Sequence, residues 1–168
     1  VPYQSGRRGS LKALDTVQRS VNITKTQICV DSVQDGEPSG FLYNPYMPER
    51  IAFLGYLSLI NVMDRFFDRM QCPQAYYQYR AWQAKKSDQR QPEKEVTQFM
   101  AEETLHSKNG EKATFTIQVQ FRQNATWQGT IAWMENKKIQ QFRSALEMIK
   151  LVDNALAESS GSDTVDWE

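Results

Sequence analysis

The chain has few of the residues that enzymes and metal sites most often use. Among 168 residues there are one histidine, His106, and two cysteines, Cys29 and Cys72. Two cysteines make neither a disulfide framework nor a zinc site, and no glycine-rich phosphate loop or dinucleotide fingerprint occurs. We interpret the cysteines as reduced structural thiols and His106 as a solvent-exposed residue. The sequence therefore favours a protein without catalytic activity, and we expect it to hold no metal and no cofactor.

A long apolar run and an excess of one charge are missing as well. The longest apolar run, near residues 51–63, is broken by Gly55, Ser58 and Asn61, and it is shorter than the roughly 20 residues that a membrane span needs. Residues 1–20 lack the apolar centre of a signal peptide. Lys plus Arg and Asp plus Glu are 20 each, so no overall field attracts nucleic acid or an anionic membrane. We therefore expect a cytoplasmic protein that does not bind membranes.

What the sequence does contain is one pattern that occurs twice. Residues 26–67 align without a gap with residues 115–156, at an offset of 89 positions. The twelve matched positions follow the periodicity of strands and then that of a helix, and we interpret them as two copies of one supersecondary unit. The matched pairs are Ile28/Ile117, Val30/Val119, Gly40/Gly129, Leu42/Ile131, Phe53/Phe142, Leu57/Leu146, Leu59/Met148, Ile60/Ile149, Val62/Leu151, Met63/Val152, Asp64/Asp153 and Phe67/Leu156.

One of the matched pairs consists of aspartates. Paired carboxylates such as Asp64 and Asp153 are able to perform acid/base chemistry or to hold a cation. Each lies late in its predicted helix, however, where the helix dipole does not favour a negative charge. We therefore expect solvated or capping roles for both.

The second copy shows the elements of the unit most clearly. Apolar and polar residues alternate over 115–121 and again over 127–133, which predicts two strands with one buried face each. A short third segment reaches Phe142. Ser144 and Glu147 then have the spacing of a capping box, which predicts the start of a helix. The helical residues that we expect to be buried are Leu146, Ile149, Val152 and Leu156.

The first copy predicts the same order of elements and so sets the fold class. Strands are expected at 26–33, 40–44 and 50–53, followed by a helix over about 55–70. One such unit leaves an apolar face uncovered, so two units should pack around a shared core. We predict a single α+β domain over residues 1–168, in which pseudo-duplicated ββ(β)α units, at 26–70 and 115–157, form an antiparallel sheet or partial barrel covered by helices.

The remaining segments connect the two units or extend beyond them. Residues 73–107 are expected to form a helical connector, with a second helix over Val96–His106 that ends in a turn. Polar, glycine- and serine-containing tails at 1–20 and 158–168 are expected to be flexible.

The outer face of the first copy supplies the main functional hypothesis. If Leu42 points into the core, Phe41 and Tyr43 point outward, where the second copy has Thr130 and Ala132. Exposed aromatic residues on a sheet need a cover. Either a partner chain or the connector, with Tyr76, Tyr79 and Trp82, would provide it. We therefore expect a binding or regulatory module that acts through protein contacts, as a homo-oligomer, with candidate ligand-binding residues Phe41, Tyr43, Tyr79, Arg80 and Trp82.

A nucleotide or single-stranded nucleic acid is the alternative partner. Residues 65–94 carry seven basic and three acidic side chains, a net charge of +4, interleaved with Tyr76, Tyr77, Tyr79 and Trp82. Basic residues beside aromatic stacking platforms are typical of such sites. An amphipathic helix with a solvated basic face would give the same pattern.

Two short blocks of the sequence resemble known families. Asn124-Ala-Thr-Trp-Gln-Gly129 resembles the [DN]-x-S-x-x-G signature of PilZ domains, which implies a cyclic-dinucleotide site. Thr126 replaces the serine, and the R-x-x-x-R motif of that family is absent, so a hairpin turn closed by Thr126 and Gly129 is the other interpretation. The block over residues 121–149 resembles the C-terminal signature of small bacterial proteins that carry no assigned function. This second resemblance implies a bacterial cytoplasmic origin but does not indicate an activity.

Overall fold

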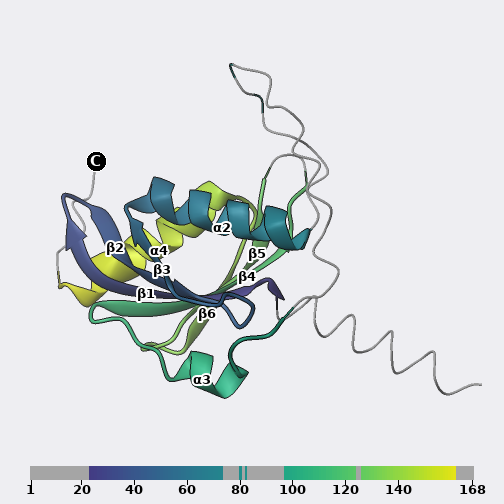
Figure 1. Ribbon diagram of the computed structural model, residues 1–168. Coiled ribbons are helices and arrows are strands. Elements are labelled where there is room, and N and C mark those ends of the chain that lie inside the picture. Colours follow the sequence, from purple (N-terminus) through teal and green to yellow (C-terminus); the bar gives the residue numbers. More distant parts are fainter. Residues whose placement is uncertain (1–22, 74–79, 81, 83–96, 124–125, 162–168) are drawn as a thin grey trace, which may run out of the picture.

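The computed structural model describes residues 23–73, 80, 82, 97–123 and 126–161. Within them, six strands and three helices form an α+β fold, and all strand pairs are antiparallel in the order β3-β2-β1-β4-β5-β6 (Figure 1). The elements are β1 (Lys25–Gln34), β2 (Glu37–Tyr43), β3 (Ile51–Leu54), α2 (Tyr56–Met70), α3 (Glu102–His106), β4 (Ala113–Phe121), β5 (Gln128–Trp133), β6 (Lys138–Phe142) and α4 (Ala145–Ser159).

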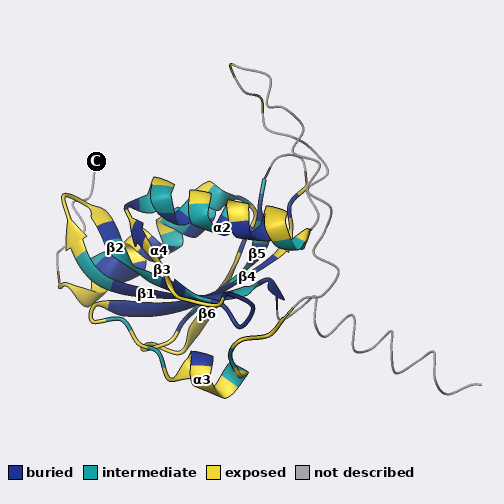
Figure 2. Ribbon diagram, in the orientation of Figure 1, coloured by how far each residue is buried: buried dark blue, intermediate teal, exposed yellow. Residues whose placement is uncertain are grey.

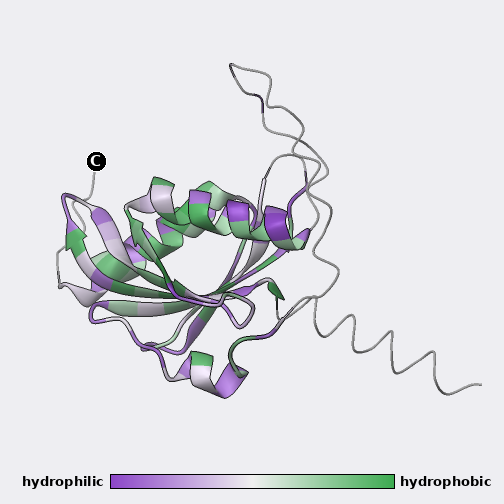
Figure 3. Cartoon of the chain, viewed as in Figure 1, coloured by the Kyte–Doolittle hydropathy of each residue, from purple (hydrophilic) through white to green (hydrophobic). Residues whose placement is uncertain are grey.

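The sheet is open, with β3 and β6 as its edge strands. Among the described residues no pairing joins these two strands, so the sheet does not close into a barrel. Helices α2 and α4 lie on one face, and the short α3 lies on the other (Figure 1). Along α2, buried and exposed residues alternate, as do hydrophobic and hydrophilic ones, in the manner of an amphipathic helix (Figures 2 and 3).

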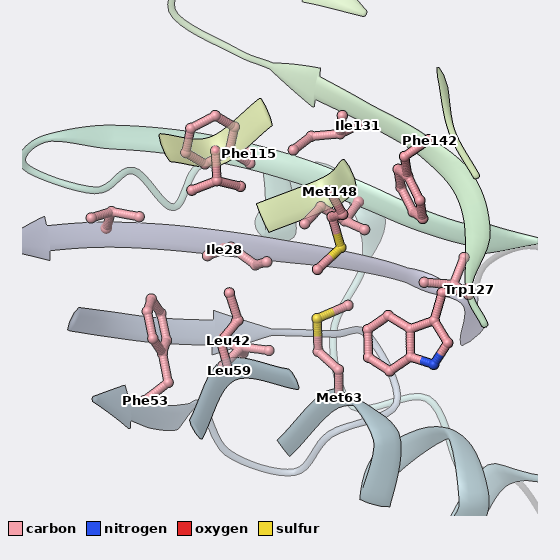
Figure 4. Close-up of a cluster of buried hydrophobic side chains, with 14 of the residues drawn as sticks. Ile28, Leu42, Phe53, Leu59, Met63, Phe115, Trp127, Ile131, Phe142 and Met148 are labelled. Atoms are coloured by element: carbon pink, nitrogen blue, oxygen red, sulfur yellow. The ribbon is translucent and has the colours of Figure 1, made fainter. Parts of the chain in front are cut away.

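The core lies between the sheet and helices α2 and α4. Alternate residues of the strands point into it, because successive side chains of a strand point to opposite faces. Figure 4 shows the side chains that meet there from strands of both halves and from both helices. Its largest fully buried members are Trp127, Phe67, Phe115, Phe142, Ile28, Leu42, Leu59, Met63, Ile117 and Met148.

The strand register is the same in the two halves of the sheet. Gly40 of β2 pairs with one residue on each neighbouring strand, and Gly129 of β5 does the same. Each partner of Gly129 lies 89 positions after the corresponding partner of Gly40. A Cβ atom on Gly40 would lie 1.9 Å from the carbonyl oxygen of Cys29, and one on Gly129 would lie 2.0 Å from that of Gln118. Both sites therefore require glycine because the neighbouring backbone is too close for a side chain. The pairing partners are Val30 and Phe53 for Gly40, and Val119 and Phe142 for Gly129.

The two long helices begin in different ways. At α4 the hydroxyl of Ser144 accepts a hydrogen bond from the Glu147 N–H at 3.1 Å, and the Glu147 carboxylate accepts from the Arg143 N–H at 2.6 Å. The predicted cap is therefore confirmed, with Arg143 rather than the serine as the second donor. At α2 the cap position is Gly55, and the Tyr56 N–H donates instead to a Glu37 carboxylate oxygen of β2 at 2.8 Å.

The predicted buried stripe of α4 is wrong in one residue. Leu146 is 61% exposed and Ile149 is only half-buried, whereas Met148, Val152 and Ala155 face the sheet. Leu146 lies about 200° around the helix axis from Met148, since each residue advances about 100°. Leu146 therefore points away from the sheet that Met148 faces, whereas Val152 and Leu156 of the predicted stripe are buried. In α2 the matched residue, Leu57, is also exposed, at 75%.

The connector and tail predictions are tested only in part, because residues 1–22, 74–79, 81, 83–96 and 162–168 lie outside the described residues. The helix expected over Val96–His106 is shorter than predicted and begins at Glu102. The backbone N–H groups of Phe99 and Met100, which precede the helix, both donate to the Pro45 carbonyl and not to carbonyls of a longer helix. Helix α4 continues to Ser159, so residue 158 still belongs to the helix.

Candidate binding surfaces

Phe41 and Tyr43 lie on the outer face of β2, as the alternation predicts, and both are half-buried. The guanidinium carbon of Arg50 lies 3.8 Å from the centre of the Phe41 ring. Arg50 also donates a hydrogen bond of 3.4 Å to the Tyr43 hydroxyl, and the Lys108 ammonium lies 5.9 Å from the Tyr43 ring centre. Cations above aromatic faces are attracted by the ring quadrupole. The two aromatics are therefore partly covered by basic side chains of the same chain.

A segment of the chain also packs across the outer face of the first half. This α3 segment, residues 97–112, places Leu105 in a fully buried position and leaves Cys29 of β1 3% exposed. The Gln27 side-chain amide donates to the Lys108 carbonyl. In the described part of the chain, residues 97–112 thus cover part of this face; of the Tyr76–Trp82 region, which was one of the two expected covers, only residues 80 and 82 are described.

An ion pair fixes the start of α3 to the sheet. The Lys25 ammonium lies 2.9 Å from a Glu102 carboxylate oxygen, and its hydrogen bond and positive charge hold the pKa of Glu102 below the usual range. The His106 imidazole lies 3.7 Å from the same carboxylate and is 41% exposed. His106 is therefore a surface residue, as the sequence indicated.

Of the other predicted site residues, the structure describes Arg80 and Trp82. Arg80 is exposed, and Trp82 is fully exposed at 107% relative accessibility. A side chain this exposed does not cover the sheet. Tyr79 lies outside the described residues.

Neither cysteine is placed for nucleophilic chemistry. Burial is the largest cause that raises the pKa of Cys29 to about 11, so its sulfur is a thiol at neutral pH, whereas thiolate is the reactive form. Cys72 is partly buried, and the two cysteines are not joined in a disulfide.

Arg122 is a buried cation that the sequence did not reveal. Its side chain is 5% exposed, and its Nε donates to the Pro73 carbonyl at 2.7 Å. A terminal nitrogen donates to Asp68 at 2.7 Å and to Asp64 at 3.2 Å, and the guanidinium lies 5.6 Å from the Phe67 ring centre. Arg122 follows an alternating strand and so looks like an ordinary surface residue in the sequence. Its contacts join β4 to the end of α2.

The matched aspartates are not partners of each other in a common site. Asp64 binds Arg122, whereas Asp153 accepts a hydrogen bond of 3.2 Å from the Tyr56 hydroxyl. Burial, with the nearby Asp153 charge, raises the pKa of Tyr56. Within the described ranges no group of three or more His, Cys, Asp or Glu residues is arranged to hold a metal.

Apolar side chains are exposed near both edges of the sheet. Leu54, at the end of β3, is 81% exposed, and Leu57, in the first turn of α2, is 75% exposed. We call these two residues the β3–α2 corner. Near the opposite edge of the sheet, Ile139 of β6 is 71% exposed and Leu146 of α4 is 61% exposed. Large exposed aliphatic residues on edge elements are typical of contact surfaces.

A pocket of about 130 Å³ lies between β5, β6 and α4. Phe115, Ile131 and Trp133 contribute apolar walls from the sheet. The Lys138 ammonium lies 3.5 Å from a Glu158 carboxylate oxygen, and both side chains line the pocket while remaining largely exposed. The other lining residues are Gln140, Leu151, Asn154 and Ala155.

The segment that resembles the PilZ signature is explained in part by packing. Gly129 lies inside β5, where the close Gln118 carbonyl requires a glycine. The Thr126 hydroxyl donates to the Arg143 carbonyl at 3.4 Å. Residues 124 and 125 are outside the described part of the chain.

Comparisons with protein-family models, curated proteins and solved structures find no match to this chain. Of the helices that the structure describes, none combines the length and apolar character needed to cross a membrane.

Proposed function

We propose that this protein is a non-catalytic binding or regulatory module that acts through protein contacts, beginning with a second copy of itself. The observation that carries the proposal is the β3–α2 corner, where Leu54 and Leu57 are 81% and 75% exposed beside an edge strand. Burying two leucines against a partner would contribute on the order of 1.5–3 kcal/mol each. Within the described residues β3 pairs only with β2, so its outer edge offers backbone groups to another strand.

A second copy is the partner that the charges favour. The chain has a formal net charge of zero at pH 7, so two copies do not repel one another strongly. The position that matches Leu54 in the second half is Arg143, which pairs with Glu147 at 3.0 Å. Because a charged pair replaces one leucine there, the two corners are not equivalent, and the β3–α2 corner is the more apolar one.

Sedimentation of paired variants tests this proposal. Leu54→Ser with Leu57→Ser should convert an oligomer into a folded monomer, because the apolar contact is lost while the core is unchanged. The matched control is Ile139→Ser with Leu146→Ser, which removes two aliphatic residues of similar exposure from the other half and should leave the mass unchanged. A wild-type chain that sediments as a monomer at all concentrations would contradict self-association, as would an equal response to both double variants.

We also propose that the two halves arose as pseudo-duplicated ββ(β)α units in one cytoplasmic protein. Support comes from the common order of elements, the matched register around Gly40 and Gly129, and the two irregularities of the ladders, one after Val30 and one after Val119. Such shared detail is difficult to obtain from two unrelated segments, because a bulge inserts one residue at one place in a strand.

A nucleotide or single-stranded nucleic acid is the second candidate partner, and one observation favours it. Trp82 is fully exposed and Arg80, two positions earlier, is exposed as well. An exposed indole beside a guanidinium is able to stack on a base and neutralise a phosphate. Fluorescence titration with oligo(dT) at low and physiological salt provides the test: phosphate binding should weaken steeply with salt, and Trp82→Ala should reduce it. A signal that is insensitive to both changes would exclude this candidate.

A further inference from the structure

The pocket beside α4 exists at a place where the two halves differ in side-chain volume. Phe66 of α2 is the residue 89 positions before Ala155 of α4, and each is only 6% exposed. The helices share their buried positions around these residues, since Leu59 and Met63 of α2 match Met148 and Val152 of α4. The first helix thus presents a phenyl ring to the sheet where the second presents a methyl group. The missing ring accounts for the space between α4 and the sheet.

The size and lining of the pocket fit one aromatic ring. Its volume is about 130 Å³, and an apolar cavity of about 150 Å³ is large enough to hold benzene. Phe115, Ile131 and Trp133 line it from the sheet, and Leu151 and Ala155 line it from α4. Apolar walls of this kind favour a ring over a polar group, because a buried polar group needs hydrogen-bond partners.

The polar lining residues carry both signs of charge. Lys138 and Glu158 are 3.5 Å apart, with side chains that are 61% and 59% exposed, so solvent and a bound molecule can reach both. Asn154 and Gln140 add amide donors and acceptors. An ammonium and a carboxylate on neighbouring atoms of one ligand would complement this pair of charges. A ring joined to such a head group is an aromatic amino acid.

We propose that this pocket binds a small zwitterionic ligand with one aromatic ring, of the aromatic amino acid class. The ring occupies the space that Phe66 fills in the first half, the ligand carboxylate faces Lys138, and the ligand ammonium faces Glu158. This site is separate from the β3–α2 corner, so its failure would leave the proposed self-association unaffected.

Titration of the full chain with L-phenylalanine, followed by chemical shifts of the Trp133 indole and Leu151 methyl groups, tests the proposal. We expect saturable shifts at millimolar ligand. Hydrocinnamate lacks the ammonium and phenethylamine lacks the carboxylate, and each should bind at least about tenfold more weakly. L-Alanine carries the head group without the ring and should cause no saturable shift. Equal responses to all four compounds, or none to L-phenylalanine, would overturn the proposal.

A pocket-filling variant provides the decisive comparison. Ala155→Phe copies Phe66 into the second half and should weaken L-phenylalanine binding at least about tenfold, while the melting temperature is kept or raised. If Ala155→Phe does not fold, the same comparison is made with Ala155→Leu, which fills less of the pocket. The control is Ala157→Leu, on the same helix but outside the pocket lining. Unchanged binding in a folded Ala155 variant would show that the ligand lies elsewhere.

Discussion

The two halves of the sheet agree on the face that meets the long helices and differ on the opposite face. Toward the helices, Leu42 and Ile131 are both buried, as are the matched pairs Ile28/Ile117, Val30/Val119 and Phe53/Phe142. On the outer face β2 carries Phe41 and Tyr43, where β5 carries Thr130 and Ala132. The difference coincides with the α3 segment, which packs on the first half and places Leu105 in a buried position there. The inner face packs on a long helix in both halves and keeps the same apolar pattern. The outer face is covered by the α3 segment in the first half, and its side chains differ between the halves accordingly.

The largest expected effect tests the shared inner face. Leu59→Ala and Met148→Ala remove matched side chains that are 1% and 0% exposed, and each should cost about 2–5 kcal/mol of unfolding free energy. Denaturant unfolding monitored by circular dichroism measures both.

The controls for this pair are Leu57→Ala and Leu146→Ala, which change exposed leucines of the same two helices. Each should alter the unfolding free energy of the monomer by less than about 0.5 kcal/mol. If Leu146→Ala cost as much as Met148→Ala, Leu146 would be buried and not exposed as described here.

The outer face offers the second test. Phe41→Ser with Tyr43→Ser should destabilise the fold by about 2–4 kcal/mol, because two half-buried rings lose apolar contact area. The matched change in the second half, Thr130→Ser with Ala132→Ser, should have a much smaller effect. Thermal unfolding of all three proteins measures the difference, and sedimentation of the Phe41/Tyr43 variant should still show the wild-type mass. A loss of the oligomer without a loss of stability would move the partner surface from the β3–α2 corner to these aromatics.

The smallest expected effect concerns the helix starts. Ser144→Ala removes a local cap from α4 and should cost about 1 kcal/mol. Glu37→Ala removes the carboxylate that accepts from the Tyr56 N–H at α2 and should cost a similar amount, about 0.5–1.5 kcal/mol, as a hydrogen bond does. Equilibrium unfolding in urea checks both. A neutral Glu37→Ala variant would show that water caps α2 as well as the carboxylate does.

Several features of the fold were accessible from the sequence because they depend on neighbouring residues. Alternation over 115–121 predicts β4 because a strand repeats every two residues. Ser144 and Glu147 predict the start of α4 because a cap acts within one turn. The outward direction of Phe41 and Tyr43 followed from the same alternation. Their status as a partner site did not follow, because it depends on which distant segment covers them.

The sequence alone therefore determined the order of strands and helices, the buried face of each strand and one helix cap. These features depend on the two-residue repeat of a strand, on the repeat of about 3.6 residues of a helix and on contacts within one helical turn. The tertiary structure alone decided that Met148 and not Leu146 of α4 faces the sheet, how Arg122 reaches Asp64 and Asp68, and that Glu37 caps α2 from β2. These contacts join residues that are far apart in the chain. Their formation depends on the distances that packing creates, and the spacing of residues along the sequence does not contain those distances.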